Sequence, residues 1–168
     1  MRIYKGTLTV IEDKAPLCFT YPKVTGGYSS ASRTGSELAE YHEGIEDIPH
    51  DYLTANSHEP EGTRLKFALH DDRYGDKWTI QVSMDDANLA VSSGSYVYQS
   101  TSKSGLHLDL LDPRSYYSKS SLSTGSCEVV IRSDTSFFST YSKTTVAGHT
   151  WSYIILGDTP TRFRLDID

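Results

Sequence analysis

The chain has 168 residues, the size of one ordinary domain, with 16 lysine and arginine residues against 22 aspartate and glutamate residues and a formal net charge of -6. Nucleic acid is a poor partner for such a chain, because non-specific affinity for phosphate depends on clustered basic side chains and the sequence has no basic run. A chain of this length buries enough surface to fold around one core, so we expect a single domain over residues 1–168 with no cofactor.

The N-terminal stretch, MRIYKGTLTVIEDK, predicts a strand near residues 2–11 with Tyr4, Leu8 and Val10 on one face. It lacks the apolar core of a signal peptide, and no segment has the roughly 18 apolar residues that a membrane span needs. We therefore expect synthesis in the cytoplasm without a membrane span, and the final location, for example in a virion or a released assembly, stays open.

The segment 20–62 contains many glycines and prolines, which predict an irregular stretch wrapped over the sheet. Its one helical signal covers residues 35–43, where Thr34 and Glu37 fit a capping box and Gly44 follows as a C-terminal cap. We expect at most this one short helix in the chain.

Histidine and cysteine were considered as ligands. His42, His50 and His58 recur every eight residues beside acidic residues, but their spacing matches no metal motif, and we expect no metal site. Cys18 and Cys127 are the only cysteines, which we interpret as two small core residues, with a long-range disulfide as the alternative.

The stretch LHDDRYGDKW, residues 69–78, has the density of charged and aromatic residues expected of a site, yet it lies between two alternating strands predicted near 64–70 and 78–84. A calcium loop is disfavoured because Arg73 and Gly75 occupy positions where ligands are needed. We interpret the stretch as the turn of a hairpin.

The second half continues the period of two that marks half-buried strands. The segment 88–99 is two strands if Ser93 and Gly94 form a turn, and one strand if they do not. The other strands are predicted near residues 105–111, 127–132, 137–141, 151–156 and 162–167. The fold class is therefore all-β, an antiparallel meander of hairpins that closes as a β-sandwich or an up-and-down barrel.

The inward-facing apolar residues of these strands form the predicted core. They are Leu65, Phe67, Leu69, Ile80, Val82, Leu106, Leu108, Leu110, Val129, Ile131, Trp151, Phe163 and Leu165.

An internal repeat organises the second half, with units that begin at Gly105, Gly125 and Gly148. Each unit is a glycine, an apolar strand, a turn with an aspartate and a second apolar or aromatic strand, so each is interpreted as one hairpin. In a meander every second turn lies at the same end of the sheet. Acidic turns at 70–77, 112–115, 133–136 and 157–161 are thus expected at one end, and loops at 101–105, 118–126 and 142–150 at the other.

The loop end is rich in tyrosine, serine and lysine, the composition of a binding surface, although hydroxyl-rich loops are also common simply as solvated loops. The predicted binding residues are Tyr116, Tyr117, Lys119, Tyr141, Lys143 and Lys103.

The sequence contains no nucleophile elbow, P-loop, GxGxxG or CxxC motif, and we expect no enzymatic activity. The leading expectation is a structural or protein-interaction module, such as a component of a viral particle or a secreted complex, with other protein subunits as partners. One alternative is a carbohydrate-binding module in which exposed tyrosines stack on sugars, and another is a barrel that carries a small apolar ligand. The tyrosines considered for stacking are Tyr96, Tyr98, Tyr116, Tyr117 and Tyr141.

Overall fold

The computed structural model describes residues 2–30, 39–71 and 75–168, and every helix or strand among them is a β-strand. The strands are β1 Arg2–Val10, β2 Ala15–Ser30, β3 Ala39–Asn56, β4 Leu65–His70, β5 Lys77–Val82, β6 Asn88–Val91, β7 Val97–Ser100, β8 Asp109–Leu111, β9 Gly125–Ser133, β10 Ser136–Val146, β11 His149–Gly157 and β12 Phe163–Ile167. The all-β fold class that the alternating pattern predicts is confirmed.

The twelve strands form one antiparallel sheet that closes on itself. The order of hydrogen-bonded neighbours is β10-β11-β3-β7-β6-β5-β4-β1-β12-β9, and β9 pairs again with β10. Strand β2 pairs with both β1 and β3, and β8 lies along β9. This ring-like arrangement is the closure expected of a sandwich or a barrel.

The charged stretch at residues 69–78 connects two paired strands, as predicted. Strands β4 and β5 are antiparallel, with His70 opposite Lys77 at the last described pair. The middle of the turn, residues 72–74, lies outside the described residues. The alternation of the two strands places Leu65, Phe67 and Ile80 in the core.

The segment predicted near 88–99 is two strands. Residues 92–95 form the turn between β6 and β7, where the Ser95 N–H donates to the Ser92 carbonyl at 3.0 Å. Ser95 has a φ of 69°, in the left-handed region that tight turns use.

The prediction of an irregular segment over residues 20–62 is wrong. Most of it belongs to β2 and β3, the two longest strands, whose register continues from Thr20 opposite Pro49 to Ser30 opposite Ala39. Prolines are tolerated there because a strand with a free edge needs no hydrogen-bond donor on that side. Of the predicted helix, residues 39–43 are part of β3 and residues 35–38 lie outside the described residues.

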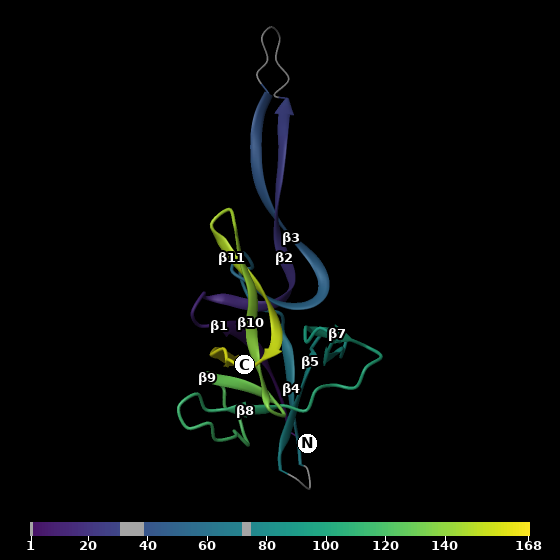
Figure 1. Cartoon of the computed structure of the whole chain (residues 1–168), viewed down its shortest axis with the longest axis vertical. Coiled ribbons are helices and arrows are strands. Elements are labelled where there is room, and N and C mark those ends of the chain that lie inside the picture. Colours follow the sequence, from purple (N-terminus) through teal and green to yellow (C-terminus); the bar gives the residue numbers. More distant parts are fainter. Residues whose placement is uncertain (1, 31–38, 72–74) are drawn as a thin grey trace.

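The outer part of this hairpin projects from the body of the molecule (Figure 1). Strand β2 pairs with β1 only through Ala15 and Pro16, and β3 pairs with β7 and β11 only within residues 52–56. We call the described residues 20–30 and 39–49 the arm. Within the described residues the arm strands pair only with each other.

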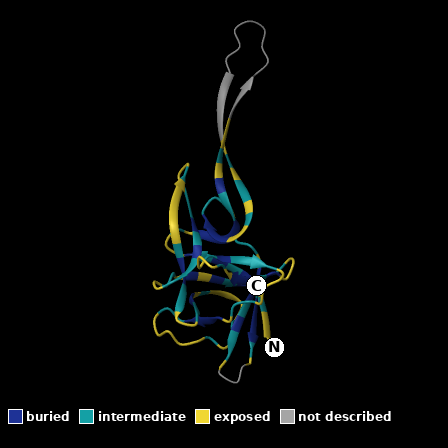
Figure 2. Cartoon of the chain, turned by 45° about the vertical axis from the view of Figure 1, so that its right-hand side comes forward, coloured by how far each residue is buried: buried dark blue, intermediate teal, exposed yellow. Residues whose placement is uncertain are grey.

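The interior of the ring is filled by buried side chains, and Figure 2 shows the buried residues concentrated in the body below the arm. Of the predicted core, Leu106 is only partly buried and Trp151 is not a core residue, as described below. The remaining predicted core residues are buried: Leu65, Phe67, Leu69, Ile80, Val82, Leu108, Leu110, Val129, Ile131, Phe163 and Leu165.

The repeat yields one hairpin and not three. Strands β9 and β10 pair across Ser133 and Ser136, so the unit that begins at Gly125 is a hairpin. In the unit that begins at Gly105, all of which the structure describes, there is no second strand: within this unit β8 pairs only through an isolated bridge between Leu111 and Ser118. In the last unit β12 leaves β11 and pairs with β1 and β9, because β11 already has β3 and β10 on its two edges.

Candidate functional site

The residues of β11 that face outward are not the ones that the sequence predicts. Trp151 was predicted to face the core, but Ser152 and Ile154 are the buried residues of this strand. Both alternating sets of this strand contain apolar residues, and a shift of one residue moves every side chain of a strand to the other face. Trp151 and Tyr153 therefore lie on the outside of the ring.

These two rings belong to a continuous cluster of eight aromatic side chains from five parts of the sheet. None of the eight is fully buried. We call this cluster the aromatic face; its members are Tyr21, His50, Tyr52, Tyr96, Tyr98, Tyr141, Trp151 and Tyr153.

Tyr153 is the centre of the aromatic face. Its ring centroid is 5.0 Å from that of Trp151, 5.1 Å from Tyr96 and 5.9 Å from Tyr52, each in an edge-to-face arrangement. Edge-to-face packing is a favoured geometry because the positive ring edge meets the negative ring face. Burial, followed by the neighbouring tyrosines, raises the pKa of Tyr153 and so favours its protonated hydroxyl.

Two strand registers bring the outer members together. Tyr141 of β10 lies opposite Tyr153 of β11, and Tyr52 of β3 lies opposite Tyr98 of β7. Residues directly opposite in an antiparallel pair point to the same side of the sheet. Tyr52 and Tyr141 are the most exposed members, with 39% and 50% of their surface accessible.

His50 is enclosed by rings from three strands. Its ring centroid lies 5.1 Å from Tyr21, 5.7 Å from Tyr52 and 6.2 Å from Tyr153. The His50 Nε2 atom is buried and has no hydrogen-bond partner among the described residues. Burial lowers the pKa of His50, against a smaller opposing effect of Asp51, and so favours the neutral imidazole.

A polar hollow of about 360 Å³ lies beside the aromatic face and shares Tyr98 with it. Carboxylate, amide and hydroxyl groups line it, which can accept from or donate to a polar ligand. The lining residues are Asp51, Asp85, Ala87, Tyr98, Gln99, Ser100 and Thr101.

A hydrogen-bonded network holds the base of the arm to the body. Asp47 accepts from the Asn56 side-chain amide at 2.9 Å and is bonded to His58 Nδ1 at 2.8 Å. Asn56 also donates to Thr20, whose hydroxyl donates to Glu59 at 2.7 Å. These bonds fix both arm strands at their base relative to the sheet.

The three histidines that were considered as metal ligands have different surroundings where the structure describes them. His50 lies in the aromatic face and His58 at the base of the arm, while the side chain of His42 lies outside the described residues. In the described part of the chain no three histidine, cysteine or acidic side chains are placed to hold a metal ion. Both cysteines are free: Cys18 is buried beside Thr54, and Cys127 is partly buried.

The predicted binding residues at 116–119 lie at the end of the molecule that was expected to carry only acidic turns. The loop around Lys119 lines a hollow together with Gly75, Asp76 and Lys77 of the β4–β5 hairpin. The Tyr116 ring contacts Phe137 at the start of β10, with the centroids 6.2 Å apart. Tyr117 lies in the same loop and is exposed.

The other predicted binding residues have different neighbours. The Lys143 ammonium forms an ion pair with Asp13 of the β1–β2 turn, and Asp13 raises the pKa of Lys143. The Lys103 carbonyl accepts a hydrogen bond from the side chain of Asn88, the first residue of β6. Of the predicted binding residues only Tyr141 joins the aromatic face. Residues 118–120 lie beside the β4–β5 hairpin and residues 141–143 beside the aromatic face and the β1–β2 turn, so the expectation that the predicted binding residues gather at one end is wrong.

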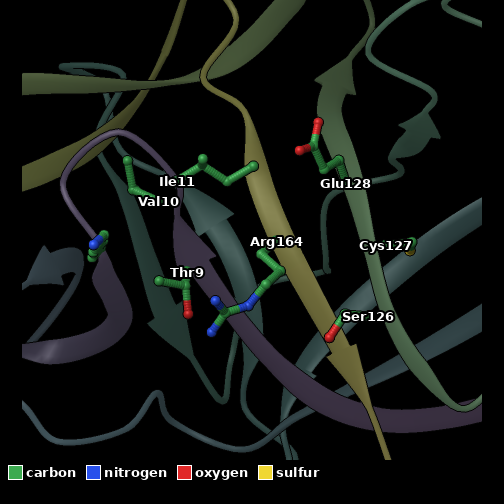
Figure 3. A pocket seen from close by; sticks show the side chains of 8 residues that line it. Thr9, Val10, Ile11, Ser126, Cys127, Glu128 and Arg164 are labelled. Carbon is green, nitrogen blue, oxygen red and sulfur yellow. The ribbon is translucent and has the colours of Figure 1, made fainter.

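A third hollow lies on the outer side of β1, β12 and β9 (Figure 3), with a volume of about 470 Å³. Arg164 lies in it between Thr9 and Ser126, but its Nε already donates to Asp166 at 2.9 Å. Cys127 also lines this hollow, and burial raises the pKa of its thiol, which disfavours the reactive thiolate. Arg164 is therefore already engaged by a carboxylate, and Cys127 is not an activated nucleophile.

Comparison with protein-family models, curated proteins and solved structures gives no match. In the described residues no helix has the length and apolar character to cross a membrane.

Sequence reasoning found only part of the aromatic face. Tyr96, Tyr98 and Tyr141 were recognised as candidates for stacking on sugars, whereas Tyr21, His50, Tyr52, Trp151 and Tyr153 were missed. Alternation in β11 gave no signal for the missed residues, because both alternating sets contain large apolar side chains and only the structure shows that Ser152 and Ile154 are buried.

Proposed function

We propose that this protein is a non-enzymatic assembly module that binds other protein subunits through the arm. The observation that carries the proposal is the projection of the β2–β3 ribbon from a closed sheet (Figure 1). The register pairs from Thr20–Pro49 to Ser30–Ala39 span about 30 Å at the usual rise of a strand.

The physical argument concerns the free edges of the arm. A two-stranded ribbon is only marginally stable in water, and its outer edges present backbone N–H and C=O groups to any chain that adds a strand. Strand addition to an exposed edge is a common mode of protein recognition. A subunit that pairs with the arm would satisfy these groups and stabilise the ribbon.

Charge restricts the partner. The arm sequence is acidic, with Glu40, Glu43, Glu46 and Asp47 against Lys23. Two arms placed side by side would repel each other, because like charges would face across the contact. The arm is thus suited to a neutral or basic surface, on another protein or on the body of a second copy.

The test is an arm deletion. Lys23 and Glu46 are directly opposite in register, so residues 24–45 can be replaced by a two-residue Asn-Gly turn. We expect the full chain to self-associate in sedimentation velocity and the deletion variant to remain monomeric with an unchanged β-sheet circular dichroism spectrum. The proposal that the arm joins copies of this chain is contradicted if the full chain stays monomeric at every concentration. It is also contradicted if the full chain and the deletion variant associate equally.

Two matched variants belong in the same experiment. Replacing Asp71 and Asp72 with asparagine alters the connection between β4 and β5, away from the arm, and should leave association unchanged. The sequence-based prediction that binding uses Tyr117 and Tyr141 is tested by their double replacement with serine. If that variant dissociates while the arm deletion does not, the loop residues and not the arm carry the contact.

A further inference from the structure

We propose that the aromatic face is a binding site for a neutral oligosaccharide, formed where partly exposed rings of five neighbouring segments lie beside the polar hollow at Tyr98. This inference goes beyond the assembly role and does not depend on it. The variants that test it leave both arm strands at full length.

The residue types of the aromatic face favour a ligand with both apolar and polar surfaces. Its members are six tyrosines, one tryptophan and one histidine, so each ring carries a polar group. None is charged at neutral pH, because the pKa of His50 is lowered and its imidazole is neutral. A pyranose ring has one face of C–H groups and a rim of hydroxyls. The C–H face stacks on the negative face of an aromatic ring, and the hydroxyls bond to phenol and indole groups.

The arrangement provides two exposed rings for stacking, because Tyr52 and Tyr141 are the most accessible members and both contact Tyr96. Along Trp151, Tyr153, Tyr96 and Tyr141, successive ring centroids are 5.0, 5.1 and 6.0 Å apart. These contacts hold the rings in fixed orientations, and a preordered site loses less side-chain entropy on binding. An extended chain of sugar units is thus a better fit than a single sugar.

The hollow at Tyr98 supplies the second observation. Gln99, Ser100 and Thr101 of its lining offer amide and hydroxyl groups, and Asp51 and Asp85 offer carboxylates that accept hydrogen bonds from sugar hydroxyls. The same carboxylates, with the net charge of -6, disfavour an anionic glycan. The ligand is therefore a neutral saccharide and not a uronic acid or sulfated polymer.

The positions of the two tryptophans allow ligand binding to be followed by tryptophan fluorescence. Trp78 is 1% exposed and its indole N–H donates to the Lys119 carbonyl, whereas Trp151 belongs to the aromatic face. A ligand on the face should change the fluorescence of Trp151 and leave Trp78 unaffected. Trp151→Phe should abolish the change.

The experiment is affinity electrophoresis in gels that contain β-glucan, xylan, galactomannan or dextran, with polygalacturonic acid as the acidic comparison. Retardation by at least one neutral polymer is then measured by titration of the fluorescence with its soluble oligosaccharides. Tyr52→Ala and Tyr141→Ala, at the two most exposed positions of the face, should each weaken binding by about tenfold, the order expected for loss of one stacked ring.

The matched control is Tyr117→Ala, because Tyr117 is 78% exposed and lies outside the aromatic face. It should bind as the wild type does. Tyr141→Phe, which keeps the ring and removes the hydroxyl, should retain most of the affinity. The proposal is overturned if no neutral polymer retards the wild type, if only polygalacturonic acid does, or if Tyr117→Ala weakens binding as much as Tyr52→Ala.

Discussion

The two sides of β11 show how differently one strand can be used. Ser152 and Ile154 point into the ring and are buried, while Trp151 and Tyr153 point outward and remain partly accessible. The inside of the ring consists mostly of aliphatic and phenylalanine side chains, and the outside cluster consists of rings with polar tips. The inner side stabilises the fold by removing apolar area from water, and the outer side keeps its rings available for contact.

The largest expected effect lies on the inner side. Leu108 is fully buried, and its backbone forms an antiparallel bridge with that of Trp78 in β5. Leu108→Ala should lower the free energy of unfolding by about 2–5 kcal/mol, because it removes buried methyl groups and leaves a cavity. Urea denaturation measures this, with Met84→Ala as the control, since Met84 is 95% exposed and should change stability by less than about 0.5 kcal/mol. Equal effects would contradict the assigned faces.

The next effect concerns Asp109 of β8, the one buried carboxylate among the described residues. Asp109 accepts from Lys77 at 2.8 Å and from Arg132 at 3.1 Å. Asp109→Asn should lower the free energy of unfolding by about 1.5–3 kcal/mol, the range for hydrogen bonds to a charged group. A thermal or urea unfolding curve identical to the wild type would show that the two cations do not depend on this partner.

A smaller effect is expected on the outer side. Tyr141→Ser should lower the free energy of unfolding by no more than about 1.5 kcal/mol, because half of the residue is already in water and it mainly loses ring contacts with Tyr96. Urea denaturation beside Leu108→Ala gives the comparison. A loss as large as that of Leu108→Ala would mean that the aromatic face is a second core and not a binding surface.

The smallest effect is a pH dependence at His50. Its pKa is lowered in the folded chain, so as pH falls below about 6.5 the unfolded chain takes up a proton more readily than the folded one, and stability decreases. The loss begins near the unfolded pKa and is complete below the folded pKa. His50→Phe should make the stability difference between pH 7.5 and pH 5 smaller than in the wild type, whatever its effect at a single pH. An unchanged difference, in this variant and in His50→Gln, would show that His50 titrates as it does in water.

Much of the fold followed from the sequence. Period-two alternation located the strands from β4 to β12, including the β4–β5 hairpin across a turn of charged residues. It also identified most of the core correctly, because in strands such as β4 only one set of alternating residues is strongly apolar. The arm was missed because Pro22, Gly26, Gly27 and Pro49 are residues that usually end strands, and only a ribbon with free edges tolerates them.

The candidate site was decided by tertiary structure. The sequence by itself determined that neighbours in β11 point to opposite faces, but both sets contain large apolar residues, so alternation could not tell which set is buried. Pairing of β11 with β3 and β10 decided it, by turning Ser152 and Ile154 into the ring. The same closure brought rings from distant segments together, which no local pattern predicts, because convergence depends on strand order and register and not on spacing along the chain.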